Sequence, residues 1–564
     1  MEKASIKFTD FTFKYYTQQA PTLHEINLEI RSGEKVLIIG ASGSGKSTLG
    51  HCLNGLIPYA YKGDITGSLE VGGSDTREVG IYDLSKNIGT VIQDSDAQFV
   101  GQTVGEDMAF AMENDNVAQS EMIERVKKVA GLVGMDKHLK NSPYGISGGQ
   151  KQRTALAGVL VDDVDILLFD EPLANLDPKT GKLAMEIIED IHKNYGKTVI
   201  IIEHRLEDVL HIPIDRIILV ADGRIIADMD PKTLFMSGLL EKYGIREPLY
   251  ISALKYAGVD LDKLDLARVE SIDMDLAGDG LKAWYAKREP HPQERGNVLL
   301  SARDLHFSYD GNKENIKGVS FDIYEGEMLA IAGTNGAGKS TVAKLICGFE
   351  KLDSGSLTFE GQDLTKFSIK ERADYIGYVM QNPNQMISKA KIYDEVALGL
   401  RLRGFSEDEI ATRVDEVLKI CGLYEFIDWP ISALSYGQKK RVTIASILVL
   451  KPKLLILDEP TAGQDHRHYT EIMTFLEKLN ALGVTVMIIT HDMHLMLEYT
   501  QRCLVFNEGL LVAQDSPSAV LSDMDIIDTA NLAETSLIKL AKRLGIEEPR
   551  TFVQAFVDEE RKRR

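Results

Sequence analysis

The chain has 564 residues, of which 64 are basic and 85 acidic, so its formal net charge is −21. That length predicts several domains, each large enough to form a core of its own. The acidic balance disfavours non-specific binding to nucleic acids, which depends on Lys and Arg contacts to phosphates. Because no apolar run reaches about 18 residues and no apolar segment opens the chain, we expect a soluble, cytoplasmic protein with neither a membrane-spanning helix nor a signal peptide. Four scattered cysteines, none in a C-x-x-C pair, argue against a disulfide framework or a zinc site.

The predicted elements occur twice, in the same order. Each copy has a buried strand, a glycine-rich turn, a helix and two later apolar strands. In the first copy the first strand is expected at 36–39, the helix at 48–56, and the two later strands at 165–169 and 198–202. In the second copy the same elements are expected at 329–332, 341–349, 453–457 and 485–489. Apolar strands separated by helical stretches are typical of a parallel sheet covered by helices, so the predicted fold class is α/β.

Longer sequence matches accompany these elements. GASGSGKST at 40–48 returns as GTNGAGKST at 333–341, and SGGQKQR at 147–153 returns as SYGQKKR at 435–441. LLFDEPLANLD at 167–177 returns as LILDEPTAGQD at 455–465. A repeat about 290 residues long is far longer than a solenoid unit, so it indicates the duplication of a whole domain.

Both glycine-rich turns fit G-x-x-x-x-G-K-[ST], the pattern of a phosphate-binding loop. Glycines let backbone N–H groups approach phosphates, and the N-terminus of the following helix adds positive potential. We expect Lys46 and Lys339 to reach the β- and γ-phosphates of ATP. The hydroxyls of Ser47 and Ser340 are expected to ligate Mg²⁺. The nucleotide-binding set in these loops is Gly40, Ser42, Gly43, Gly45, Lys46, Ser47 and Thr48, and Gly333, Asn335, Gly336, Gly338, Lys339, Ser340 and Thr341.

An Asp-Glu-Pro sequence follows a later apolar strand of each copy. An aspartate at that position, Asp170 or Asp458, is expected to hold Mg²⁺ beside the phosphate loop. The next residue, Glu171 or Glu459, is then placed to orient and polarise the attacking water.

With these residues the chain resembles the ATP-binding cassette (ABC) family over nearly its whole length. The family signature L-S-G-G-Q is matched at 146–150 and 434–438. The resemblance implies two tandem P-loop ATPase domains, each with a mainly parallel core sheet, an antiparallel β part, a helical signature subdomain and a C-terminal extension. It also implies roles for Gln93 and Gln381 as Mg²⁺-contacting glutamines, His204 and His491 as switch histidines, Tyr15 and Tyr309 as adenine-stacking aromatics, and Asp177 and Asp465 as D-loop aspartates.

In this family the signature helix of one cassette binds the γ-phosphate held by the other. One site would therefore combine Lys46, Glu171 and His204 with Ser435, Gly437 and Gln438. The other would combine Lys339, Glu459 and His491 with Ser147, Gly149 and Gln150. Tyr436 departs from the family, which has glycine there, so we expect two hydrolytic sites of unequal rate.

A second glutamine after each Q-loop, Gln98 or Gln385, is similar to the energy-coupling factor (ECF) ATPases. In that subfamily this region forms a short helix that docks a membrane scaffold subunit. The resemblance implies a peripheral ATPase on the cytoplasmic face of the membrane, with a scaffold subunit and a substrate-binding membrane subunit as partners. The resemblance implies a vitamin, thiamine precursor or metal ion as solute. Because two complete cassettes in one chain can form both sites, we expect one double-cassette chain per importer, and from the acidic charge we expect no nucleic-acid partner.

Two other functions stay open. A soluble ABC-F-like ATPase of the ribosome would carry a strongly basic linker, whereas the linker here has nearly equal numbers of basic and acidic residues. A fused sugar-importer ATPase is disfavoured by the doubled glutamines.

Domain boundaries are expected where the sequence becomes polar and contains proline, at KREPHPQERGN. We place the first ATP-binding domain at 1–245, and a connector with its C-terminal extension at 246–296. The second ATP-binding domain is placed at 297–530, and its extension at 531–564.

Overall fold

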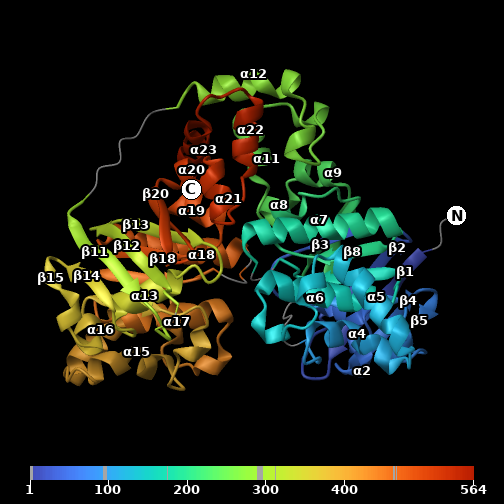
Figure 1. Ribbon diagram of the computed structural model, residues 1–564, viewed down its shortest axis with the longest axis horizontal. Helices are drawn as coiled ribbons and strands as arrows, with labels where there is room; N and C mark the ends of the chain where they lie inside the picture. The colour runs from blue at the N-terminus through green and yellow to red at the C-terminus, as the bar shows by residue number, and fades with distance from the viewer. Residues whose placement is uncertain are drawn as a thin grey trace. The chain divides into compact units, whose positions relative to one another are not determined.

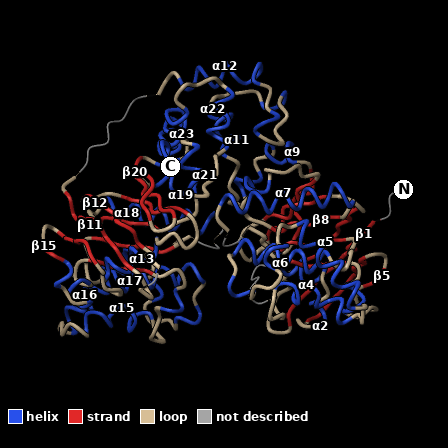
Figure 2. Tube along the Cα trace, viewed as in Figure 1, coloured by secondary structure: helices blue, strands red, loops and turns tan. Residues whose placement is uncertain are grey.

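The computed structural model describes residues 4–92, 98–173, 176–288, 296–311, 313–461, 464 and 466–563. The chain forms two compact units, Met1–Leu281 and Lys282–Arg564. Each unit contains one copy of the repeat. Figure 1 labels many of its helices and strands, and Figure 2 colours helices and strands by type. No helix of the described residues is both long and apolar enough to cross a membrane. All four cysteines are buried, and none of them forms a disulfide.

The first unit has two sheets. The antiparallel sheet has the strand order β2-β1-β4-β5, and the core sheet has the order β10-β9-β3-β8-β7-β6. The strands are β1 (Ala4–Tyr15), β2 (Leu23–Arg31), β3 (Lys35–Ile39), β4 (Gly63–Val71), β5 (Ser74–Asp75), β6 (Ile88–Val91), β7 (Ile166–Asp170), β8 (Thr198–Ile202), β9 (Arg216–Ala221) and β10 (Arg224–Met229). All core strands are parallel except β10, which pairs antiparallel with β9.

The helices of the first unit fall into three groups. The helices α1 (Lys46–Leu53), α2 (Leu56–Tyr59), α3 (Ile81–Ser85), α7 (Pro178–Tyr195) and α8 (Leu206–Val209) accompany the sheets. A helical subdomain consists of α4 (Val104–Asn114), α5 (Gln119–Leu132) and α6 (Gly148–Leu160). The C-terminal part contains α9 (Pro231–Met236), α10 (Leu239–Lys242), α11 (Leu249–Tyr256) and α12 (Met274–Tyr285), of which the last continues into the second unit.

The second unit repeats this architecture, with sheets ordered β12-β11-β14-β15 and β16-β17-β18-β13-β19-β20. Its strands are β11 (Val298–Phe307), β12 (Ile316–Tyr324), β13 (Met328–Gly333), β14 (Ser354–Phe359), β15 (Gln362–Asp363), β16 (Ile376–Val379), β17 (Leu454–Asp458), β18 (Thr485–Ile489), β19 (Arg502–Asn507) and β20 (Leu510–Asp515). Its helices are α13 (Lys339–Cys347), α14 (Ile369–Arg372), α15 (Ile392–Arg401), α16 (Glu407–Ile420), α17 (Tyr436–Leu448), α18 (His466–Ala481), α19 (Met493–Tyr499), α20 (Pro517–Val520), α21 (Met524–Thr529), α22 (Ser536–Arg543) and α23 (Pro549–Arg563).

The predicted fold class is therefore confirmed: each copy combines a mainly parallel core sheet, an antiparallel sheet, a helical subdomain and C-terminal helices. Two helix ends were predicted wrongly. The helices placed at 48–56 and 341–349 end at Leu53 and Cys347. In the first copy Gly55 has a φ of 77°, and in the second Gly348 has a φ of 79°, a left-handed conformation that stops a helix.

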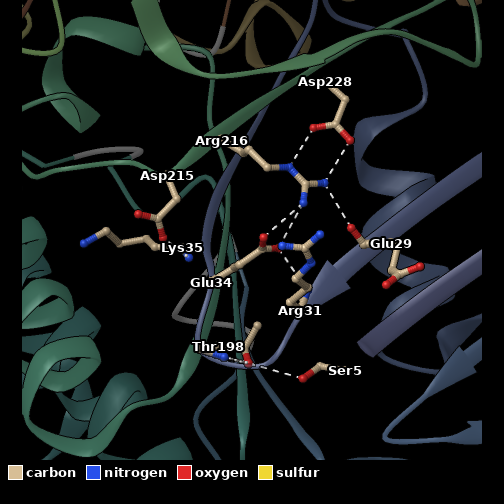
Figure 3. A network of polar contacts seen from close by, with 10 residues as sticks. Ser5, Glu29, Arg31, Glu34, Lys35, Thr198, Asp215, Arg216 and Asp228 are labelled. Carbon is tan, nitrogen blue, oxygen red and sulfur yellow. Dashed lines mark hydrogen bonds and ion pairs between the residues drawn. The ribbon is translucent and has the colours of Figure 1, made fainter. Parts of the chain in front are cut away.

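An ion-pair network anchors the antiparallel sheet of the first unit to its core sheet. The guanidinium of Arg216 on β9 donates to both carboxylate oxygens of Asp228, at 2.8 Å each, and to Glu34 at 3.0 and 3.2 Å (Figure 3). It also donates to the backbone carbonyl of Glu29 on β2, at 3.0 Å. In the second unit Arg502 makes the equivalent pair with Glu327. The network holds the start of β3 in position, because Glu34 directly precedes that strand. The strand β3 leads into the phosphate loop.

Candidate nucleotide-binding and hydrolysis sites

Both glycine-rich loops join a central core strand to a helix, at the carboxyl end of β3 or β13. The first glycine of each loop lies against a neighbouring strand. A Cβ on Gly40 would come 2.2 Å from the carbonyl oxygen of Val220, and one on Gly333 would come 1.8 Å from that of Phe506. Only glycine fits at this approach, which explains why the pattern begins with that residue.

The lysine of each loop lies along the inside of the turn. Lys46 Nζ donates to the carbonyl oxygens of Gly40 and Ala41, at 2.6 and 2.9 Å. Lys339 Nζ donates to the equivalent carbonyls of the second loop, at 2.9 Å each. Both lysines are buried, whereas Ser42, Gly43 and Ser47 are exposed and form the outer surface of the loop. In the second loop Asn335 and Gly336 are exposed and Ser340 is half-buried. A phosphate arriving at the loop would meet an ammonium already held in place.

The Asp-Glu pairs follow β7 and β17. The backbone N–H of Glu171 donates to the carbonyl of Ile202 at 2.8 Å, and that of Glu459 donates to Ile489 at 2.9 Å. Glu171 and Glu459 have φ values of 49° and 45°, which non-glycine residues rarely adopt. The left-handed conformation interrupts the strand at each glutamate, and backbone strain of this kind is frequent at functional positions.

Each glutamate faces the predicted switch histidine. Glu171 Oε1 lies 3.8 Å from His204 Nδ1, and Glu459 Oε1 lies 3.4 Å from His491 Nε2. Burial raises the pKa of Glu459 to about 8, assisted by the charge of Asp458. Burial also raises the pKa of Glu171, although His204 opposes it. A raised glutamate pKa is a property of groups that exchange protons near neutral pH.

The aspartates are the candidate Mg²⁺ ligands. Asp170 Oδ1 is buried with no hydrogen-bond partner, and burial together with Glu171 raises the pKa of Asp170 to about 6. Asp458 Oδ2 accepts a hydrogen bond of 2.9 Å from Tyr378. An orphaned carboxylate oxygen and a serine hydroxyl are hard oxygen donors, which suit Mg²⁺. The residues that would hold the ion are Ser47 and Asp170 in the first copy, and Ser340, Asp458 and Gln381 in the second.

The predicted adenine-stacking tyrosines occupy equivalent places. Tyr15 Oη lies 3.2 Å from Thr48 Oγ1, and Tyr309 Oη lies 3.3 Å from Thr341 Oγ1. Each tyrosine is thereby tied to the first turn of the helix that follows its phosphate loop. Tyr309 is 52% exposed, so its ring is available to a ligand.

The signature residues begin α6 and α17. Ser147 and Ser435 are N-caps, and each forms a reciprocal capping box with the glutamine three residues later, Gln150 or Gln438. The spacing S-x-x-Q therefore has a local structural cause in addition to any contact with nucleotide. Gly149 packs close to Thr180, since a Cβ there would come 2.2 Å from Thr180 Cγ2, whereas the site of Gly437 is more open.

Two predicted residues, Gln93 and Asp465, lie outside the described residues. Asp177 is the N-cap of α7, where its side chain accepts from the N–H of Thr180 at 2.9 Å. Gln381 is exposed, and the residues after it form the short 3₁₀ helix Pro383–Gln385 at the position where the ECF resemblance implies a short helix.

Sequence reasoning missed a contact between the Q-loop and the signature helix of the second copy. Lys440 is buried, and its Nζ donates to the carbonyls of Met380 and Gln381 at 2.7 and 2.8 Å. Burial lowers the pKa of Lys440 to about 8. Tyr436, the departure from the family signature, donates to the same carbonyl of Gln381 at 3.2 Å. A lysine in the first turns of a helix gives no sequence signal for such a contact.

Glu203, the residue before His204, directly follows β8 and is fully buried, and its burial was not predicted from the sequence. The sequence signal for this burial was the presence of a charged residue directly after the apolar run TVIII.

The comparisons with known proteins cover nearly the whole chain. A family model described as "ABC transporter" matches residues 23–174 and 316–462, and one described as "ATP-binding cassette cobalt transporter" matches residues 237–307. A putative ABC transporter ATP-binding protein of Clostridium perfringens is 53% identical over 561 residues, which are 99% of each chain. One of Vibrio parahaemolyticus is 54% identical over 564 residues, 99% of this chain and 97% of the relative. Among solved structures, cbiO1 from Clostridium perfringens, described as part of the ABC transporter complex cbiONQ, is 35% identical and covers 45% of this chain and 100% of its own, with a TM-score of 0.39.

Proposed function

The chain belongs to the ABC transporter family of ATP-binding proteins, whose ATPase activity is coupled to transport, and we propose that it powers the uptake of a small solute by an ECF-type importer. The observation that carries the catalytic part is the repeated juxtaposition of a glutamate and a histidine, Glu171 with His204 and Glu459 with His491, at the ends of neighbouring strands of the sheet that carries the phosphate loop.

The proposed hydrolysis is an in-line attack of water on the γ-phosphate. Glu171 or Glu459 orients the water and accepts its proton, for which a carboxylate with a raised pKa is suited. The phosphate-loop lysine neutralises charge that develops on the phosphate, and the histidine contacts the γ-phosphate. Ser47 and Asp170 in the first site, and Ser340 and Asp458 in the second, would hold Mg²⁺, which would supply further neutralisation of phosphate charge.

We propose that the two cassettes act as a pair and complete each other's sites. Ser435, Gly437 and Gln438 would serve the ATP held by Lys46, and Ser147, Gly149 and Gln150 would serve that held by Lys339. The support is that the capping boxes pre-form both helix N-termini, whose N–H groups attract an anion. In an E171Q chain, which retains only the second hydrolytic site, S147A should lower turnover more than S435A does. The opposite order would contradict this pairing.

The proposed partners are an integral membrane scaffold subunit and a substrate-binding membrane subunit, with one double-cassette chain per importer on the cytoplasmic face. Support comes from the cobalt-transporter model, which matches residues 237–307. That description makes a metal ion the first solute to test, before a vitamin or thiamine precursor. The short helix Pro383–Gln385, beside the exposed Gln381, is the proposed docking element for the scaffold.

Affinity purification of the tagged chain from detergent-solubilised membranes tests the importer role. We expect co-purification of a multi-span membrane protein in a ratio of one to one. Co-sedimentation with ribosomes, and no membrane partner, would favour the ABC-F alternative. Uptake of labelled Co²⁺ and of labelled thiamine by cells with and without the chain would then identify the solute class.

A further inference from the structure

The carboxylate of Glu203 lies in a buried, apolar environment. This residue follows β8, whose five residues are all buried, and is itself 0% exposed. Its backbone N–H continues the core sheet by donating to the carbonyl of Ile38 on β3, at 3.1 Å. A charge in such a place destabilises the fold unless several partners surround it.

The partners of Glu203 come from two loops of the hydrolysis site. Oε2 accepts from the N–H of Leu173, two residues after the catalytic Glu171, at 3.2 Å. Oε1 accepts from the N–H groups of His204 and Arg205, at 2.8 and 3.3 Å. Burial would raise the pKa of Glu203, but the charges of His204 and Arg205 and the backbone N–H groups outweigh it, so the pKa is lowered.

The same oxygen lies beside the imidazole of the switch histidine. Glu203 Oε1 is 3.1 Å from His204 Nδ1, closer than Glu171 Oε1 at 3.8 Å. The two atoms are at ion-pair distance without the geometry of a hydrogen bond, so the effect is electrostatic: the charge of the carboxylate favours the tautomer that has its proton on Nδ1.

The second copy has a different arrangement. Thr490, also fully buried, occupies the position of Glu203, and its hydroxyl accepts from the N–H of Asp492 at 3.0 Å. His491 there turns its Nε2, not its Nδ1, toward the catalytic Glu459. The orientation of the histidine ring therefore differs between the two copies, and so does the residue that precedes the histidine.

We propose that Glu203 is a positioning residue of the first hydrolysis site: it keeps a proton on Nδ1 of His204 and ties the His204 loop to the Glu171 loop, so that Nε2 is the nitrogen presented to the γ-phosphate. The inference rests on the proposed role of His204 in hydrolysis. It means that the imidazole of the switch histidine is positioned by different residues in the two sites. This difference would make their rates of ATP hydrolysis unequal.

The first test is spectroscopic and needs no nucleotide. In the ¹⁵N-labelled, nucleotide-free full chain, long-range ¹H–¹⁵N correlations of imidazole rings show which nitrogen carries a proton, with the His204 signals assigned by their loss in H204Q. We expect Nδ1 of His204 to be protonated in the wild type and to lose this preference in E203Q. E203T, which introduces the residue of the second copy, should behave like E203Q. The control is E186Q, because Glu186 makes an exposed pair with His211 at 3.1 Å on the same unit. An unchanged His204 signature in both Glu203 variants would overturn the proposal.

The second test is kinetic, in an E459Q chain that keeps only the first site active. By analogy with other outer-shell partners of functional histidines, E203Q should lower kcat about 10- to 100-fold, with KM for ATP changed less than about threefold. E203Q should add no further loss to H204Q, because Glu203 acts through that ring. A rise in KM with unchanged kcat, or an equal loss in the H204Q background, would show a merely structural role and refute the proposal. If H204Q itself keeps full turnover, the proposed role of His204 fails, whereas the spectroscopic result still decides the contact with Glu203.

Discussion

Replacing Glu459 by glutamine should stabilise the second unit in a strongly pH-dependent way. The pKa of Glu459 is about 8 in the folded chain, against a reference value of 4.5. Between those two values the folded state binds more protons than the unfolded state, so the wild type loses stability as pH rises through this window. Integrating the linkage relation gives a cost of about 1 kcal/mol at pH 5 and about 4 kcal/mol at pH 8. Glutamine has the same shape and carries no charge, so E459Q avoids this cost.

The assay is thermal unfolding of the nucleotide-free chain in EDTA, followed by tryptophan fluorescence. Both tryptophans, Trp284 and Trp429, lie in the second unit, so the signal reports that unit. Since 1 kcal/mol corresponds to about 2–4 °C for a unit of this size, the gain in Tm for E459Q should be at least about 5 °C larger at pH 8 than at pH 5. E171Q makes the same substitution in the first unit and should leave this transition in place. A gain in Tm that is equal at both pH values, or a loss, would refute burial as the cause of the raised pKa.

The remaining predictions concern the second unit, and their effects on stability are followed by the same tryptophan fluorescence. K440M should lower the stability of this unit by about 2 kcal/mol, because the Met380 carbonyl loses its side-chain donor and the Gln381 carbonyl keeps only Tyr436; an unchanged Tm would contradict the contact. G333A should cost about 3 kcal/mol or more and abolish binding of a fluorescent ATP analogue, since its Cβ would come 1.8 Å from the carbonyl oxygen of Phe506. G336A, with no atom within 4 Å of its Cβ and a φ of 78°, should cost only about 1 kcal/mol, and equal losses in the two variants would refute the steric argument. S435A should cost about 1 kcal/mol through loss of the helix cap, and no change would mean that the capping box contributes nothing.

The local motifs were readable from the sequence because their geometry depends on a few consecutive residues. The glycine-rich loops, the capped signature helices and the strands at 198–202 and 485–489 occupy the positions that the patterns predict. Helix ends were less predictable, since the left-handed Gly55 and Gly348 were not recognised as stop signals. The domain ranges and the roles of the site residues stay predictions.

The sequence by itself determined that this protein is a duplicated ABC ATPase, because each motif is contiguous and occurs twice in the same order. Only the tertiary structure decided which residues meet around those motifs. The core sheet places β8 between β3 and β7, strands that are far apart in the chain, and so brings Glu203, His204 and Glu171 together. It likewise brings Lys440 to the Q-loop carbonyls sixty residues away in sequence. Such contacts depend on strand order and on the direction of single side chains, and neither is encoded in any one stretch of sequence.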